Sequence, residues 1–254
     1  PVAGVEQKTV WSLAGPVPPD LCAGVDAVVH SAYDLRRAAM EQNVGGTERL
    51  AEAAAAAGVG RQVFIGSYSA HAGAAGAYGR SKFILQEYFL ARGHAVVRPG
   101  LVIGPGGMFE RMAKTLRLPI APVADGGRDR VPVVALADFS TALAEIVERR
   151  RAGLYNLFNP EPVTLKDILA AVRAATASRT ALLPAPAALL AALTRVMEKL
   201  GVAPPLDPES FAALKANQKV GDRSDLGAFV AAPLALAGMV EAAVREIAAR
   251  RAAA

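Results

Sequence analysis

The chain has 254 residues, and 53% of them are hydrophobic. It has no apolar run as long as the roughly 18 residues of a membrane span, and its start lacks the pattern of a signal peptide. A globular cytoplasmic protein is therefore expected. Its single cysteine, Cys22, excludes an internal disulfide and fits a reducing compartment, and no Cys/His cluster suggests a metal site. The formal net charge of +5 comes from scattered arginines, without the aromatic-interleaved basic stripe of nucleic-acid-binding proteins, so no nucleic acid partner is expected.

The first hundred residues alternate between strand and helix patterns. Short apolar runs predict buried strands, and longer runs with helical periodicity, closed by Gly58 and Gly93, predict helices. This alternation predicts a parallel sheet with right-handed crossovers. The predicted strands span 26–32 and 61–67, residues 94–105 supply a third strand and an exit turn, and the predicted helices span 34–57 and 78–92.

After Gly104 the pattern changes. Residues 104–130 are rich in turn signals, and a strand at 131–136, a helix at 137–151 with Asp138 as its N-cap and a strand at 153–159 follow. The remainder predicts mostly helices: one capped by Thr164, and others near 186–200, 208–217 and 235–250. We therefore expect a sheet domain of residues 1–103 plus 131–158, and a smaller, mainly helical domain of residues 104–130 plus 159–254.

A tyrosine and a lysine stand four residues apart near the start of the second predicted helix. Tyr78 and Lys82 therefore share one helix face, and a nearby ammonium lowers the pKa of a phenol toward the range of useful proton transfer. Ser67 and Ser69 end the preceding strand, at the sheet edge where parallel-sheet proteins bind ligands. The alternative is a tyrosine at the edge of the core beside a lysine that extends to solvent.

Six segments, taken together and in order, resemble the extended, epimerase/dehydratase-like branch of the short-chain dehydrogenase/reductase superfamily. They are GVDAVVHSAYD, NVGGTERLAEAAAAAGVGRQVFIGSYSA, YGRSK, VVRPGLVIGPGG, VPVVALADFSTAL and LYNLFNPEPVTLKDIL, and they cover most of residues 20–170. The resemblance implies an α/β Rossmann-like, doubly wound parallel sheet with a smaller, mainly helical C-terminal substrate domain, and NAD or NADP as cofactor.

The resemblance also implies roles for individual residues. Tyr78 is similar to the catalytic acid/base and Lys82 to its partner, which in the family also binds the nicotinamide ribose. Ser69 is similar to the substrate-orienting serine, with Ser67 as the alternative. Asn43 resembles a helix asparagine that supports the active-site water and backbone; the alternative is a polar residue bonded to the main chain. The cofactor-binding positions implied are His30, Ser31, Ala32, Ser67, Tyr78, Lys82, Arg98, Pro99, Gly100 and Val102.

Three departures separate the sequence from the family pattern. The family opens with a strand and a glycine-rich G-x-x-G-x-x-G turn that binds the pyrophosphate, and we recognise no such motif in this sequence. Either the chain continues about 40 residues upstream, or its main phosphate cradle is missing. The Ser69–Tyr78 loop is shorter than in sugar-nucleotide epimerases, which suggests another substrate class or a more open site. A Thr-Asp-Glu triplet near the serine is missing, which disfavours dehydratase chemistry.

Two functions remain open at this stage. The first is a nicotinamide-dependent oxidoreductase or epimerase that acts on a secondary alcohol or carbonyl of a small molecule through Tyr78, Lys82 and Ser69. The second is a non-catalytic nucleotide-binding or assembly scaffold, as in atypical relatives. The resemblance further implies a homodimer through the helices at 40–57 and 78–92, against the alternative of a monomer. The segment that distinguishes NAD from NADP is not recognisable, so both remain.

Overall fold

A computed structural model of the chain describes residues 7–36, 39–74, 76–149, 151–200, 213, 215–218, 221 and 223–252. Its main sheet has four parallel strands in the order β1-β2-β3-β7. These strands are β1 (Ala27–His30), β2 (Arg61–Ile65), β3 (Ala95–Pro99) and β7 (Gly153–Leu157).

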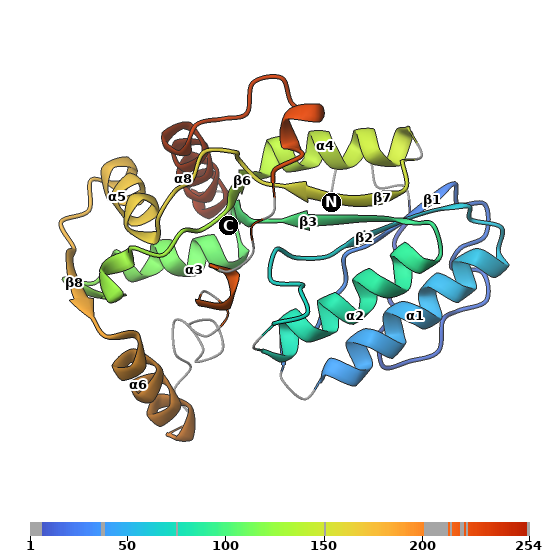
Figure 1. Cartoon of the computed structure of the whole chain (residues 1–254), viewed down its shortest axis with the longest axis horizontal. Coiled ribbons are helices and arrows are strands. Elements are labelled where there is room, and N and C mark those ends of the chain that lie inside the picture. The colour runs from blue at the N-terminus through green and yellow to red at the C-terminus, as the bar shows by residue number, and fades with distance from the viewer. Residues whose placement is uncertain are drawn as a thin grey trace.

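Helices cover both faces of this sheet. The helices α1 (Met40–Ala56) and α2 (Ala77–Ala91) lie side by side against one face, and α4 (Leu136–Glu148) lies against the other (Figure 1). The central strands β2 and β3 are largely buried because both of their faces meet helices, and most of their residues are apolar, with Gln62 and Arg98 as buried polar exceptions. The predicted doubly wound parallel sheet is therefore confirmed.

Two predictions for the first half need correction. The helix expected from residue 34 begins at Met40, and the described residues 34–36 are not helical. The strand expected at 94–105 is two strands, because the chain leaves the main sheet at Gly100 to form β4 (Leu101–Ile103), which pairs with β6 (Val133–Ala135) in a separate sheet. A Cβ at Gly100 would lie 2.3 Å from the carbonyl oxygen of Pro132, so only glycine permits this crossing.

The prediction that residues 104–130 consist mainly of turns was wrong in part. This stretch contains α3 (Gly107–Thr115), β5 (Ile120–Ala124) and the 3-10 turn η2 (Asp125–Gly127), and β5 pairs with a strand that was not predicted, β8 (Ala181–Ala185). The N-cap of α4 is Ala135 instead of Asp138, whose carboxylate accepts a hydrogen bond from the amide of Leu234 at 2.9 Å.

The C-terminal helices follow the sequence more closely. They are α5 (Leu165–Thr176), α6 (Ala187–Lys199) and α8 (Leu236–Ala252), with a 3-10 turn, η3 (Leu226–Ala228), before the last. The Thr164 cap is confirmed as a capping box with Asp167. Residues 213 and 215–217 of the helix expected at 208–217 are helical; its other residues lie outside the described part of the chain. None of the described helices is long and apolar enough to cross a membrane.

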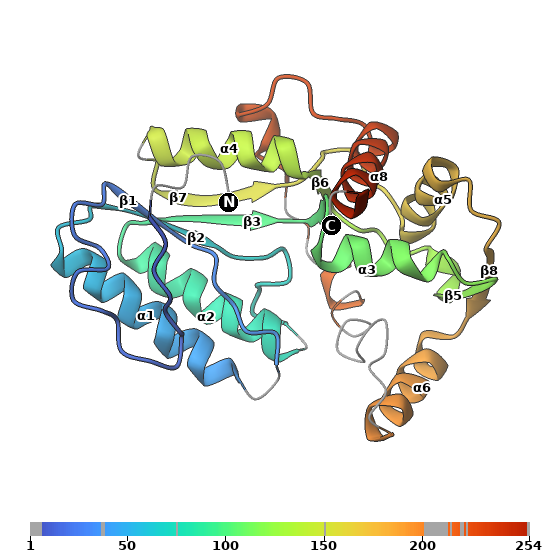
Figure 2. The same ribbon diagram turned by 180° about the vertical axis from the view of Figure 1, so that it is seen from behind.

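Strand β6 connects the cores of the two halves. Val134 packs in a cluster with the main sheet and α4, whereas its neighbours Val133 and Ala135 pack in a second cluster with α3, α5 and α8. The short β4–β6 sheet therefore joins the two halves, and the domain ranges given above remain a prediction. Helix α6 projects away from the rest of the molecule in both views (Figures 1 and 2).

Candidate functional site

Helix α2 carries the Tyr78 and Lys82 pair one turn apart at the carboxyl edge of the sheet. Tyr78 is 37% exposed in the first turn, and Lys82 is buried, 4% exposed. The loop after β2 passes directly over this turn: a Cβ at Gly79 would lie only 2.6 Å from the carbonyl oxygen of Ser69. Gly79 therefore lets the loop that carries both predicted serines approach the first turn of α2.

The serine bonded to Tyr78 is Ser67. The Tyr78 hydroxyl and the Ser67 side chain form a hydrogen bond, and the Ser67 hydroxyl also accepts the amide of Ser69 at 3.1 Å. The Ser69 hydroxyl instead accepts the side-chain amide of Asn217 at 3.0 Å. The sequence favoured Ser69 over Ser67, but the geometry places Ser67 next to the phenol.

The pKa expectation for the tyrosine was wrong. Although the residue is 37% exposed, burial around its hydroxyl raises the pKa of the Tyr78 phenol; the Ser67 hydrogen bond lowers it in part, and a negative charge on Tyr33, when that phenol ionises, raises it further. The Lys82 ammonium donates to the carbonyl oxygen of Ile65 at 2.7 Å and lies 4.9 Å from the ring centroid of Tyr33 and 4.8 Å from that of Phe64. Burial lowers the pKa of Lys82 to about 8, so the ammonium loses its proton more easily than an exposed lysine does.

The side chains of Asn43 and Arg98 form hydrogen bonds with the main chain of nearby loops. The Asn43 side chain, 1% exposed on α1, accepts the amide of Asp34 at 2.7 Å and donates to the carbonyl of Asp34 at 2.8 Å, which matches the backbone-binding alternative. The buried guanidinium of Arg98 donates to the carbonyls of Ser67 and Tyr68, both at 3.3 Å. Arg98 thus braces the serine loop from β3.

The other predicted cofactor positions divide into two groups. Ser31 and Ala32 are exposed just beyond β1, whereas Pro99, the last residue of β3, and Gly100 after it are half-buried. His30 and Val102, by contrast, are core residues. The imidazole of His30 bonds Gln62 at 2.8 Å and packs on Phe89, and Val102 packs partly buried against the cluster beneath α4. For these two side chains the structure does not support contact with a ligand.

Sequence reasoning missed Tyr33 and Asn217. Tyr33 packs on Tyr78, and Asn217 contacts both Ser69 and the imidazole of His71, at 3.3 Å, from a segment far along the chain. Lys215 pairs with Asp125 and Asp129, and Gln218 bonds the backbone of Arg130, so this segment connects the serine loop to the C-terminal half. Tyr33 lies in the quoted segment GVDAVVHSAYD, so the sequence could have indicated it. Asn217 could not have been predicted, because the sequence around it contains no recognisable motif.

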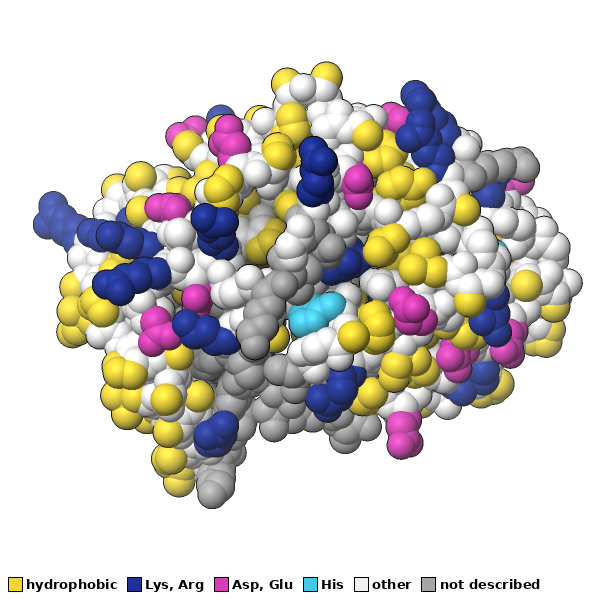
Figure 3. All heavy atoms as spheres, viewed as in Figure 1, with side chains coloured by type: hydrophobic (Ala, Val, Ile, Leu, Met, Phe, Trp, Pro, Cys, Tyr) yellow, Lys and Arg dark blue, Asp and Glu magenta, His cyan; other side chains and the backbone are white. Residues whose placement is uncertain are grey.

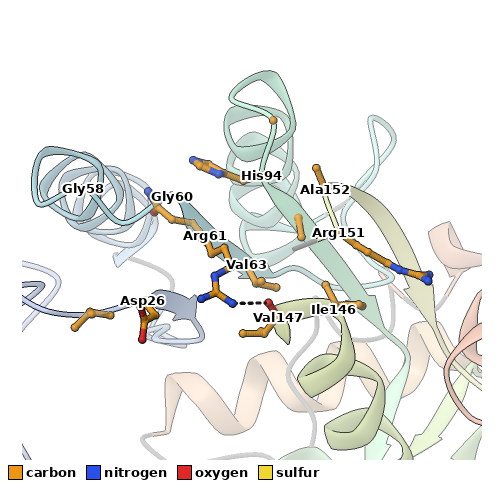
Figure 4. A pocket seen from close by; sticks show the side chains of 14 residues that line it. Asp26, Gly58, Gly60, Arg61, Val63, His94, Ile146, Val147, Arg151 and Ala152 are labelled. Atoms are coloured by element: carbon orange, nitrogen blue, oxygen red, sulfur yellow. Dashed lines mark hydrogen bonds between the residues drawn. The ribbon is translucent and has the colours of Figure 1, made fainter. Parts of the chain in front are cut away.

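The opposite edge of the sheet has a cavity of about 310 Å³, lined by residues at the starts of all four main strands. Its polar side chains diverge: Arg61 turns to the carbonyl of Val147, whereas His94, Asp26 and Arg151 point in other directions (Figure 4). No group of three or more potential metal ligands occurs among the described residues. On the face shown in Figure 3, Lys and Arg side chains are scattered among Asp and Glu.

The residues of this site suit the nicotinamide ribose half of a dinucleotide better than its pyrophosphate. The exposed Ser31 and Ala32, the Tyr78 and Ser67 hydroxyls and the Lys82 ammonium are groups that suit a ribose and a nicotinamide ring. For the pyrophosphate the match is poorer. The spacing G-x-x-G-x-x-G does occur, at Gly73, Gly76 and Gly79, but before α2 and not after the first strand; there Gly79 serves the close approach to Ser69.

Solved structures share this fold over most of the chain. A nucleoside-diphosphate-sugar epimerase from Staphylococcus aureus matches with a TM-score of 0.68 at 15% identity, covering 88% of this chain and 78% of that chain. A UDP-glucuronic acid 4-epimerase from Bacillus cereus, in complex with UDP-glucuronic acid and NAD, matches with a TM-score of 0.67 at 15% identity, covering 91% and 78%.

An NAD-dependent NDP-hexosamine 5,6-dehydratase involved in tunicamycin biosynthesis matches similarly, with a TM-score of 0.66 at 15% identity over 92% of this chain and 80% of that chain. No protein-family model and no curated protein matches the sequence. The chain therefore shares an α/β Rossmann-like fold with these epimerases and this dehydratase, which is the fold that the six sequence segments predicted.

Proposed function

We propose that this chain is a nicotinamide-dependent oxidoreductase or epimerase acting on a secondary alcohol or carbonyl of a small molecule. The observation that carries the proposal is the Tyr78–Ser67 hydrogen bond, with Lys82 one helical turn away at the carboxyl edge of the sheet. Proteins with this fold bind ligands at that edge. The fold neighbours include NAD-dependent enzymes, which supports the same class of chemistry.

The phenol moves the proton in this proposal. A bound nicotinamide dinucleotide would supply or accept the hydride. The Tyr78 hydroxyl protonates the substrate oxygen during reduction and is left as the phenolate; during oxidation the phenolate takes the proton of the substrate hydroxyl, and the Ser67 hydroxyl fixes the direction of the phenol. Lys82 places a cation one turn away, which favours the phenolate whenever the ammonium turns from Ile65 toward Tyr78.

Cofactor, substrate and partner are parts of the same proposal. NAD and NADP are both candidates, since neighbours were solved with NAD and with NADPH. Nucleotide sugars are the first substrates to test, because neighbouring structures contain UDP-glucose and UDP-glucuronic acid. The adjacent helices α1 and α2 offer a surface for a homodimer (Figure 1). We place the protein in the cytoplasm on its single cysteine and its composition.

The test is the variant Tyr78→Phe, which removes only the hydroxyl. We expect turnover to fall by a factor of at least about 100 while the dissociation constant for NADH or NADPH, measured by fluorescence, stays nearly unchanged. Tyr88→Phe is the matched control, because Tyr88 lies on the same helix, away from Ser67, and its ring packs under Arg92. Unchanged turnover in Tyr78→Phe would refute the role of the phenol.

A non-catalytic scaffold is the second candidate. The raised pKa of Tyr78 and the Lys82–Ile65 hydrogen bond favour it, because both oppose a readily ionised phenol. A redox assay over a panel of hydroxy and keto compounds, nucleotide sugars included, separates the two. Cofactor binding without turnover of any compound would favour the scaffold.

A further inference from the structure

One aromatic ring contacts both members of the Tyr78 and Lys82 pair. The ring of Tyr33 meets that of Tyr78 edge-on, with the centroids 5.0 Å apart and the planes at 78°. The Lys82 ammonium lies 4.9 Å from the Tyr33 centroid. A cation near the face of an aromatic ring is attracted by the ring's quadrupole, and the attraction is stronger where water is excluded. Tyr33 therefore acts on the buried ammonium and on the phenol from one position.

The hydroxyl of Tyr33 is tied to the backbone of α2. It lies 2.7 Å from the hydroxyl of Ser81, a fully buried residue, and the Ser81 hydroxyl donates its proton to the carbonyl oxygen of Tyr78 at 2.9 Å. Since a serine hydroxyl has one proton to donate, Tyr33 is the donor in its bond to Ser81. The resulting chain runs from Tyr33 through Ser81 to the main chain of Tyr78 and fixes the ring relative to the helix.

A second element fixes the backbone next to Tyr33. The buried side chain of Asn43 on α1 closes two hydrogen bonds on the main chain of Asp34. Tyr33 is thus held on one side by α1 through its neighbour and on the other by α2 through its own hydroxyl. These two constraints fix the position of the Tyr33 ring, and the ring in turn restrains the Tyr78 and Lys82 side chains that it contacts.

We propose that Tyr33 is a positioning residue of the candidate site, whose ring holds the Lys82 ammonium beside Tyr78. The inference rests on the proposed function, because positioning matters only if the pair meets a cofactor and a substrate. It extends that function with a role for a residue that carries no proton in the reaction.

The experiment compares Tyr33→Phe, which keeps the ring, with Tyr33→Leu, which keeps apolar bulk but loses the ring. We expect Tyr33→Phe to stay within about threefold of the wild type in kcat/KM. Tyr33→Leu should lose about tenfold or more in kcat/KM, as expected for a desolvated cation–ring contact, and weaken NADH binding. Tyr88→Leu is the matched control, because it removes a ring that also carries a cation, Arg92, outside the site.

A second readout needs no activity. In the protein without cofactor, nuclear magnetic resonance of the Lys82 methylene next to the ammonium should show an upfield ring-current shift that Tyr33→Phe keeps and Tyr33→Leu loses. Ser81→Ala, a smaller change, should weaken kcat/KM about threefold and serves if Tyr33→Leu does not fold. An unchanged Lys82 resonance, or kinetics of Tyr33→Leu equal to those of Tyr88→Leu, would overturn the inference. A wild type without turnover but with the expected resonance changes would overturn the proposed function and leave only the contact.

Discussion

The two edges of the main sheet differ in what their polar side chains do. At the carboxyl edge, the Tyr78 and Ser67 hydroxyls are bonded, the Tyr33 ring contacts both Tyr78 and the Lys82 ammonium, and Arg98 braces the loop that carries Ser67. At the amino edge, the cavity has more formal charge on its wall, but its side chains point apart (Figure 4). Convergence on a shared point, and not the number of charges, distinguishes a candidate reaction centre from a surface hollow.

Backbone geometry explains the difference. Strands of a parallel sheet end together at the carboxyl edge, and the loops that follow them turn back over the same helix starts. Here Gly79 lets the serine loop reach the first turn of α2, and Asn43 fixes the loop after β1. At the amino edge, β2 and β3 start just after the tight turns at Gly58 and Gly93 that end the preceding helices. Because these left-handed turns are short, few residues are left whose side chains could point into the cavity.

The largest expected effect tests which serine belongs to the converging group. Ser67→Ala removes the hydrogen bond partner of the Tyr78 hydroxyl, so we expect kcat to fall by about 100-fold with a small change in KM. Ser69→Ala leaves that bond in place and breaks only the contact with Asn217, so we expect a fall of about tenfold or less, mainly through KM. Steady-state kinetics of both variants give the answer. The reverse order would return the catalytic role to Ser69.

Local sequence signals predicted much of this edge, and tertiary contacts decided the rest. Apolar runs and helix ends place β1, β2, α2 and the end of α1 within a few residues, and the i, i+4 spacing places Tyr78 and Lys82 on one face. The choice between Ser67 and Ser69 depends on how the loop folds back at Gly79, which no spacing encodes. The pKa of Tyr78 was mispredicted because burial depends on neighbours such as Tyr33, and Asn217 reaches the site across 148 residues of chain.

A variant of His30 tests whether this residue belongs to the core or to the cofactor-binding edge of the sheet. Burial lowers the pKa of its imidazole from 6.5 to about 4. The unfolded chain therefore binds the proton first as the pH falls, and the neutral native histidine contributes stability that is present above pH 6.5 and is lost between about pH 6.5 and 4, roughly 3 kcal/mol in total. We expect His30→Gln to show a flatter decline of the free energy of unfolding over this range, measured by urea denaturation.

The same variant separates stability from binding. Because the imidazole contacts Gln62 and Phe89 in the core, His30→Gln should change the dissociation constant for NADH by less than about threefold. Parallel pH curves for the wild type and the variant would show that His30 is not the group that titrates. A large loss of cofactor affinity in a variant of normal stability would return His30 to the carboxyl edge.

The smallest expected effect lies at the amino edge. Arg61 lines the cavity there and makes a long hydrogen bond, 3.4 Å, to the carbonyl of Val147. Its guanidinium has no part in the group around Tyr78, so Arg61→Ala should leave kcat and KM within about twofold and change the free energy of unfolding by about 0.5 kcal/mol or less. A selective fall in activity, with stability unchanged, would mean that the two edges communicate and that convergence alone does not mark the functional edge.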